Sequence, residues 1–295
     1  MAKKKSQFWE SGLLNNATYM QYYNRLTELS ISMFDWKNLP PSVDPRFLEL
    51  TLFSKGAAVF FKDEDMEEDK QLLALQVLMQ GDFDIYHIPR NRTAFAGYDR
   101  GYQKRLDEKN SVIIWNNLLH KNSMLDVRMF ATRLYNLDRA IDVNANAQKT
   151  PILINCDETE KLTMENIYQK YDGNAPVIFG HKGLNATQVS VLNTGAPYVA
   201  DKLYTLKTQI WNEALTYLGI SNINVQKKER LITDEVTRNQ GGVIASRYSR
   251  LEARRQAADE INKMFDLNIK VDYREDYQVV DDNIDNTTGD GEDYE

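Results

Sequence analysis

Residues 199–218 constrain the fold of this chain most strongly, because their pattern predicts an amphipathic helix with an unusual polar face. Apolar side chains recur at three- and four-residue spacing along one face; they are Val199, Leu203, Leu206, Ile210, Ala214, Tyr217 and Leu218. The opposite face is polar but almost uncharged, with Asp201, Lys202, Thr205, Thr208, Gln209, Asn212, Glu213 and Thr216. We expect a helix about 30 Å long. Its polar face is either an ordinary solvated surface or a wall that attracts a ligand only weakly.

The length and composition predict a folded protein with a sizeable core. The chain has 295 residues and 42% hydrophobic content, which is enough for one large domain or two ordinary ones. No segment approaches the roughly 18 apolar residues of a membrane span, and the N-terminus lacks the apolar stretch of a signal peptide. We therefore expect a soluble protein without a membrane partner, made in a cytoplasm. The single cysteine, Cys156, excludes an internal disulfide and follows apolar residues typical of a buried strand.

Charge is distributed unevenly along the chain. Three lysines stand near the start, at positions 3–5, whereas residues 281–295 hold seven carboxylates and no basic residue. Because the formal net charge is −7, the chain between these ends carries −3. Tight binding of nucleic acid over a broad face depends on lysine and arginine releasing counterions from phosphates. Any nucleic-acid contact should therefore be local or weak, and the acidic tail, residues 276–295, is predicted to be disordered.

The first half of the chain predicts a helix, a small antiparallel β region and a second long helix. The first helix should cover residues 16–36 and end before Pro40 and Pro41. Short strands are expected at residues 56–61, 72–79, 83–88 and 111–115. The second helix should cover residues 123–146. Its spacing places Leu125, Met129, Leu134, Leu137 and Ile141 inward, and Arg128, Arg133, Asp138 and Arg139 outward.

The second half predicts a compact module between two long helices. Strands are expected at residues 152–154 and 177–179, with a helix at 163–171 between them. Beyond the helix at 199–218 comes a basic, glycine-containing loop. A third helix at 249–265 and a strand at 269–273 follow this loop. The predicted fold class is therefore α+β, with long helices flanking a strand–helix–strand module.

No catalytic residue, cofactor site or metal site is predicted from the residue pattern. The three histidines are far apart and have no partner at metal-ligand spacing, and no phosphate-binding P-loop motif is present. One carboxylate cluster contains Asp63, Glu64, Asp65, Glu67, Glu68 and Asp69. We interpret this cluster as a solvated loop with Lys62 and Lys70 beside it. A divalent-metal site of a nuclease is the alternative that the cluster leaves open.

Four motifs resemble those of one known family in the same order along the chain. They are residues 35–45 (DWKNLPPSVDP), 144–151 (NANAQKTP), 171–179 (YDGNAPVIF), and 227–230 (KKER) followed by 233–236 (TDEV). With these motifs, the chain resembles the portal protein, or upper collar connector, of phi29-like small tailed bacteriophages. Shorter matches at residues 196–199, 211–213 and 218–220 extend the resemblance over most of residues 19–271. It is weakest over residues 64–122.

The resemblance implies a non-enzymatic ring of twelve subunits around a DNA channel at one capsid vertex. Residues 1–15 would be a flexible basic arm, and residues 16–122 a wing with a helix and a small β region. Residues 123–149 and 198–220 would be stem helices, and residues 150–197 the clip module. Residues 221–248 would be the channel-loop region, residues 249–275 a further helix and strand of the wing or crown, and residues 276–295 the acidic tail. The implied location is the head–tail junction of the virion.

The resemblance also assigns candidate DNA contacts. Lys202, Lys227 and Lys228 match family positions that face the channel, whereas a further lysine position of the family corresponds to Asn193 here. Arg230 and Arg238 lie in or beside the same loop and could engage phosphates. Since a fixed cation adds affinity and hence a barrier to sliding, a mixture of few cations and many neutral polar groups suits a duplex that has to move.

The family also implies partners for the ends of the ring. Lys3, Lys4 and Lys5 match a basic N-terminus that helps to dock the packaging motor, which includes a structural RNA in some members. Other implied partners are the packaging ATPase, the major capsid and scaffold proteins, and the lower collar and tail proteins. A different class of function stays open: a nucleic-acid-binding adaptor that acts as a monomer or dimer through its basic loop.

Overall fold

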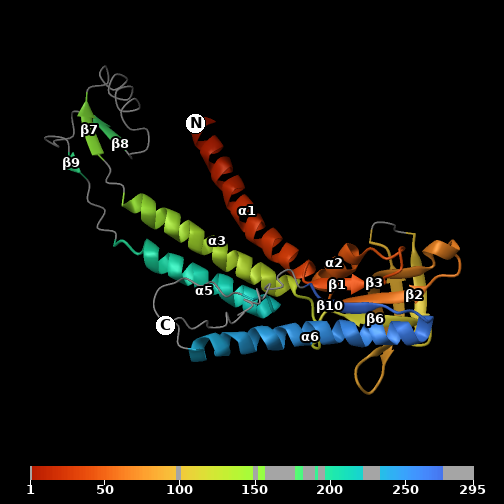
Figure 1. The fold of residues 1–295 in the computed structure, drawn as a ribbon. Helices are drawn as coiled ribbons and strands as arrows, with labels where there is room; N and C mark the ends of the chain where they lie inside the picture. Colours follow the sequence, from red (N-terminus) through yellow and green to blue (C-terminus); the bar gives the residue numbers. More distant parts are fainter. Residues whose placement is uncertain are drawn as a thin grey trace, which may run out of the picture.

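The computed structural model describes residues 2–97, 101–148, 152–156, 177–181, 190–191, 197–221 and 233–274. Three long helices, α1 (Ala2–Ile31), α3 (Met124–Ala147) and α5 (Ala200–Leu218), extend from a body built of β-strands and the short helix α2 (Pro45–Lys55) (Figure 1). The long helix α6 (Thr233–Phe265) begins beneath α5, outside this body, and its later part runs along the body. Among the described residues, no helix is long and apolar enough to cross a membrane. The architecture is mixed α and β, in agreement with the predicted class.

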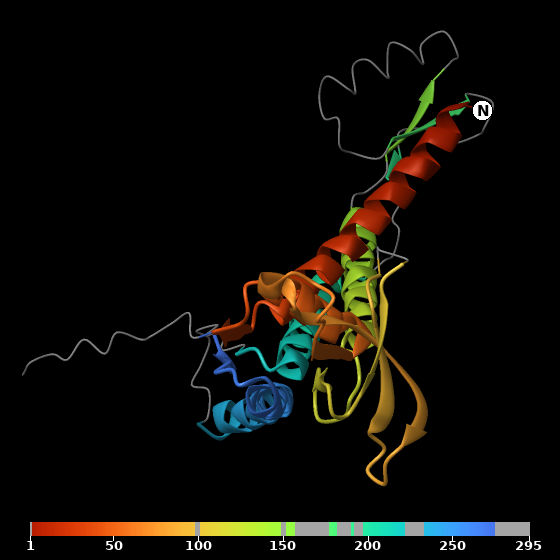
Figure 2. The same cartoon turned by 90° about the vertical axis from the view of Figure 1, so that its right-hand side faces the viewer.

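A five-stranded antiparallel sheet forms the centre of the body (Figure 2). Its strands are β2 (Ala57–Lys62), β3 (Leu72–Phe83), β4 (Pro89–Phe95), β5 (Gln103–Asp107) and β6 (Ser111–Trp115), in the order β5-β4-β3-β2-β6. The predicted antiparallel β region is thus confirmed. The prediction of a strand at residues 83–88 is wrong after Phe83, because Asp84 closes a turn by accepting hydrogen bonds from the amides of Tyr86 and Ile88. Strand β5 escaped prediction because its sequence is mostly polar.

The N-terminal helix differs from its predicted bounds at both ends. It begins at Ala2, within the segment predicted to be a flexible arm, and ends at Ile31 rather than at residue 36. Residues Phe34–Lys37 instead form β1, which pairs antiparallel with β10 (Lys270–Tyr273). Phe34 and Trp36 lie two residues apart on one side of this strand, where they pack into the same core as Val271. The apolar spacing of the preceding residues is helical, so the prediction extended the helix over residues that form a strand.

Helices α3 and α5 agree with the predicted bounds to within one residue. Together with α1 and Phe53 of α2 they form a second core, made by Leu26, Phe53, Val127, Phe130, Leu134, Ile210, Ala214, Leu215 and Leu218. Gly219 ends α5 with φ +82°, and a Cβ atom there would lie 2.9 Å from the backbone nitrogen of Arg247. Only glycine permits both this left-handed conformation and this close approach of α6.

The side-chain orientations on these helices correct several predictions. Leu125 and Met129 on α3 and Leu206 on α5 were predicted to face inward but are exposed. Asp138, predicted to face outward, instead contacts both α1 and α5. Because α3 carries apolar residues around most of its circumference, three- and four-residue spacing alone could not select the buried arc.

Helix α6 is about twice as long as predicted and places arginines in the core. Its residues 233–248 were predicted to belong to the channel-loop region, but they are helical. Arg254 is fully buried and makes a two-pronged ion pair with Glu49 of α2, with nitrogen–oxygen distances of 2.7 and 2.8 Å. It also donates to the carbonyl of Asn116 at 2.8 Å and lies 3.9 Å from the ring centre of Phe34. One guanidinium thus joins α6, α2, β1 and the segment after β6.

The module between α3 and α5 contains three short strands. Strand β7 (Ile152–Cys156) pairs in parallel with β8 (Val177–His181) and antiparallel with β9 (Ser190–Val191). The two predicted strands of this module are confirmed, and Cys156 ends the first of them as expected. The helix predicted at 163–171 and the acidic tail at 276–295 lie outside the described residues.

We predict that Glu49→Gln destabilises the fold by about 3–5 kcal/mol, because it leaves the buried charge of Arg254 without a carboxylate. Chemical denaturation measures this loss. The matched control is Asp272→Asn, which removes the carboxylate of a half-exposed ion pair with Arg255 on the same helix. That change should cost less than about 1 kcal/mol. Equal, small effects of the two substitutions would contradict the central role of Arg254.

Candidate nucleic-acid interface

One edge of α5 is polar and poor in available charge. Thr205 and Thr208 direct their hydroxyls back to the helix, donating to the carbonyls of Asp201 at 2.9 Å and Tyr204 at 3.1 Å. Their methyl groups and the neighbouring amide of Gln209 therefore form a surface with little electrostatic attraction. Among the described residues, no ion pair involves the exposed Lys202.

The remaining charges of this edge are engaged locally. Asp201 accepts a hydrogen bond from the hydroxyl of Tyr198 at 3.0 Å, which is the main reason that the pKa of Tyr198 is raised. Glu213 lies 3.8 Å from the guanidinium of Arg133 on α3. Both carboxylates are exposed, so these contacts add little to stability. Their effect is to reduce the negative charge that α5 presents to solvent. The edge can thus offer many weak polar contacts and one cation, Lys202.

A single carboxylate, Asp138 of α3, fixes α5 relative to α1. Its two oxygens accept hydrogen bonds from the hydroxyl of Tyr22 on α1 and the ammonium of Lys207 on α5, each at 2.5 Å. Burial and the bond to Asp138 raise the pKa of Tyr22. Burial alone would lower the pKa of Lys207, but its bonds to Asp138 and Tyr22 outweigh this effect and raise it. Lys207 is therefore charged at neutral pH and holds the three helices together.

A second polar contact repeats this arrangement nearer the body. The hydroxyl of Tyr217 on α5 donates to Asp126 of α3 at 2.5 Å. Burial, followed by this hydrogen bond, raises the pKa of Tyr217 to about 12. The guanidinium of Arg250 on α6 lies 4.9 Å from the same ring. Together with Asp138, these contacts set the rotation of α5 about its axis and hence the direction of its polar edge.

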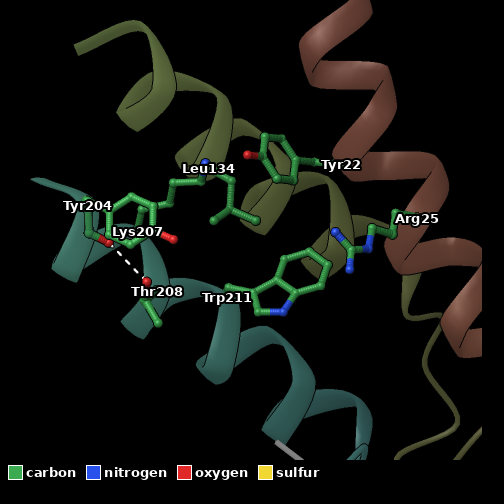
Figure 3. Close-up of a pocket in the computed structure, with 7 residues that line it drawn as sticks. All are labelled: Tyr22, Arg25, Leu134, Tyr204, Lys207, Thr208 and Trp211. Atoms are coloured by element: carbon green, nitrogen blue, oxygen red, sulfur yellow. Dashed lines mark hydrogen bonds between the residues drawn. The ribbon is translucent and has the colours of Figure 1, made fainter. Parts of the chain in front are cut away.

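A hollow of about 220 Å³ lies among the three helices (Figure 3). Its lining residues are Tyr22, Arg25, Leu134, Tyr204, Lys207, Thr208 and Trp211. The guanidinium of Arg25 lies 4.6 Å from the ring centre of Trp211. The hollow is thus aromatic and cationic. Thr208 borders both the hollow and the charge-poor edge, whereas Thr205 and Gln209 of that edge are not among the lining residues.

The structure places some of the predicted DNA contacts and leaves others outside its described part. Lys202 lies on the exposed edge of α5, as expected. Lys227, Lys228 and Arg230, and also Asn193, fall outside the described residues. Arg238 belongs to α6, and Lys3, Lys4 and Lys5 belong to α1; for these four residues the backbone alone is described.

Sequence reasoning missed the residues that orient the interface. Lys207 and Asp138 were not recognised as partners, because the helical pattern shows only that each is polar. One signal was available: Lys207 lies away from the centre of the polar face of α5, between the apolar positions Leu203 and Ile210. A charged side chain in that position requires a partner from a neighbouring helix.

The carboxylate cluster at residues 63–69 is largely explained by local structure. Asp63 is buried, accepts a hydrogen bond from the hydroxyl of Tyr102 at 2.5 Å and pairs with Lys104 at 2.7 Å. Asp65 also pairs with Lys104, and Glu67 pairs with Lys70. The prediction of a solvated loop is therefore wrong for Asp63. Among the described residues, no three histidine, cysteine or acidic side chains are placed to hold a metal ion.

Comparison with known proteins identifies the class of fold. The structure aligns with a chain of the solved structure "Portal and tail of native bacteriophage P68", with 18% sequence identity and a TM-score of 0.50. The alignment covers 95% of this chain and 92% of that one. Two further matches are an HK97 family phage portal protein from Corynebacterium diphtheriae and a chain from the virion of a native gene transfer agent. Their identities are 11% and 12%, their TM-scores are 0.42 and 0.44, and they cover 87% and 88% of this chain and 92% and 80% of their own.

The fold is therefore that of a phage portal protein. The sequence model of the family Phage Connector (GP10) matches residues 5–278. The chain belongs to this phage connector family.

The buried Asp63 should make stability depend on pH in the acid range. Hydrogen bonds from Lys104 and then Tyr102 lower its pKa below the ordinary 3.8. A carboxylate with a lowered folded-state pKa contributes stability above its unfolded-state pKa and loses it as the pH falls through the folded-state value. We expect Asp63→Asn to be less stable than the native chain at pH 7, with the difference shrinking below about pH 4. Chemical denaturation over this pH range measures it.

Glu67→Gln is the control for this titration, since Glu67 and Lys70 form an exposed pair. Its effect should be small throughout. A constant difference between the native chain and Asp63→Asn from neutral to strongly acid pH would refute the proposed titration.

Proposed function

We propose that the chain is a viral portal protein that forms a ring of twelve subunits at one capsid vertex. Double-stranded DNA enters and leaves the head through the channel of this ring, at the head–tail junction of the virion. The role is structural rather than enzymatic. Family membership over residues 5–278 and the portal fold support the proposal.

The elements have natural places in such a ring. Helices α3 and α5 form the stem, and the module with β7, β8 and β9 forms the clip. The five-stranded sheet, α2, β1 and β10, with the C-terminal half of α6, form the wing. This assignment agrees with the separation of the long helices from the body (Figure 1).

The charge-poor edge of α5 is the observation that carries the proposal. A channel has to contain a polyanion without gripping it, because each phosphate neutralised by a fixed cation adds affinity through counterion release. Threonine hydroxyls turned back to their own helix, and carboxylates engaged by Tyr198 and Arg133, leave such a surface. Lys202 adds one cationic position per subunit, which a ring repeats at a single level.

Contacts outside the stem complete the proposed assembly. Lys227, Lys228 and Arg230 engage DNA phosphates from the channel-loop region, and Arg238 does so from the first turns of α6. Lys3, Lys4 and Lys5 help to dock the packaging ATPase, or a packaging RNA where one is used. The contribution of these three lysines to RNA binding is measured by comparing RNA pull-down by the full chain with RNA pull-down by a chain that begins at Ser6. The major capsid, scaffold and lower collar or tail proteins are the other proposed partners.

The particle mass of the purified chain tests the ring directly. Twelve chains of 34.2 kDa give a species of about 410 kDa. The alternative, an adaptor that binds nucleic acid as a monomer or dimer, predicts one or two chains. Mass photometry separates the two cases, and a monomer or dimer at assembly concentrations would refute the ring.

The loop lysines should hold packaged DNA through their charge. We predict that the double change Lys227→Ala/Lys228→Ala weakens retention of DNA in filled heads. The loss relative to the native chain should be largest at low salt and shrink as the salt concentration rises, because salt screens the phosphate contacts that the native lysines make. The measurement is the fraction of heads that keep their DNA. The matched control is Lys37→Ala/Lys270→Ala, which removes two exposed lysines paired across β1 and β10. Unchanged retention in rings that assemble normally would contradict this role.

A further inference from the structure

We propose that neighbouring subunits pack through two different faces of the layer formed by α1, α3 and α5. An exposed apolar stripe on the back of α3 covers the groove between α1 and α5 on the next copy. The occupant of the groove is thus a second copy of this chain. This inference rests on the proposed ring and adds the surfaces that build it.

The three helices form a layer with α3 in the middle. Asp138 of α3 reaches Tyr22 of α1 and Lys207 of α5. Leu134, also on α3, forms part of the lining of the hollow between the flanking helices. The guanidinium of Arg25 on α1 lies beside the indole of Trp211 on α5, as Figure 3 shows. One face of the layer is therefore an aromatic groove with the buried Leu134 beneath it.

The opposite face of α3 carries an exposed apolar stripe. Leu125 and Val143 each stand nine residues from Leu134, which is about two and a half helical turns and places both on the far side of the helix. Met129 lies between them on the same side. Leu125, Met129 and Val143 are 62%, 47% and 63% exposed. Three large apolar side chains aligned on one helix mark a surface that excludes water when it is covered.

Rotational symmetry brings these two faces together. In a closed ring, each contact joins one face of a subunit to a different face of its neighbour. Rotation about the ring axis repeats every residue at the same height. The stripe is centred on the level of Leu134, because Leu125 and Val143 stand at equal distances on either side of it. The back of α3 therefore meets the neighbouring groove at the level of the hollow.

This arrangement leaves the polar edge of α5 free for the channel. The residues of that edge, such as Thr205 and Gln209, lie on neither the groove side marked by Trp211 nor the side of Ile210, which packs against α3. Stacking the layers face to back therefore buries the stripe and the groove while the edges remain accessible. The apolar and charge-poor surfaces then have separate roles.

The first test places two carboxylates in the apolar stripe. Leu125→Glu/Met129→Glu should lose the species of about 410 kDa and leave single chains of 34.2 kDa with native helix content by circular dichroism. The matched control, Ile85→Glu, alters an exposed apolar residue in the β3–β4 turn and should keep the ring. A stripe variant that still forms rings overturns the inference, whereas failure of the native chain to form rings overturns the proposed function.

Cysteine cross-linking tests the same contact in intact rings. In a Cys156→Ser background, Asn136→Cys on the back of α3 and Thr208→Cys in the groove are combined in one chain. Because the two positions lie on opposite faces of the layer, a short bis-maleimide should link neighbouring chains into a covalent ladder. Asn136→Cys combined with Ile85→Cys is the control and should give no ladder. Assembled rings that give no ladder with the first pair overturn the inference.

Discussion

The carboxylate of Asp138 links three helices that share only part of an apolar core. Tyr22 and Lys207 bond to its two different oxygens, and hydrogen bonds to a charged group are worth about 1.5–3 kcal/mol each. Tyr217 and Asp126 make the corresponding contact closer to the body. Because these bonds are directional, they fix the rotation of α5 as well as its distance from α3. The direction of the polar edge, and so the proposed channel surface, depends on this geometry.

Several charged side chains inside the fold are paired, whereas the polar edge of α5 carries few available charges. Inside the fold, cations are held by specific partners: Arg254 by Glu49, Lys104 by Asp63 and Lys207 by Asp138. On the polar edge of α5, hydroxyls turn back to the helix. The mildly acidic body is therefore compatible with the proposed DNA channel, in which the duplex has to slide rather than bind tightly.

The sequence predicted the elements with strong local patterns. The bounds of α3 and α5 follow from long amphipathic runs, and Gly219 ends α5 because of the left-handed backbone that it adopts. The sequence could not predict which side of α3 is buried, because Leu125 and Met129 fit the apolar spacing as well as Val127 does. The proposed ring offers a reason for this ambiguity, since an apolar face that is exposed in one chain can be buried in an assembly.

Tertiary contacts decided what local patterns could not. The strand at Phe34–Lys37 exists because β10, more than 230 residues away, pairs with it. From the sequence alone, Arg254 would be placed on the exposed face of a helix. The fold buries it by bringing Glu49 and Asn116 beside it. For the candidate site, Lys202 came from the family motif and from the polar face of α5. Its supporting partners, Asp138 and Lys207, required the packed structure.

A cryo-electron microscopy map of the purified ring would test the central claim most directly. The account predicts a central hole wide enough for B-form DNA, with Thr205 and Gln209 of α5 on its wall. A hole lined by Leu125 and Met129 of α3, or a small open particle without a hole, would contradict it.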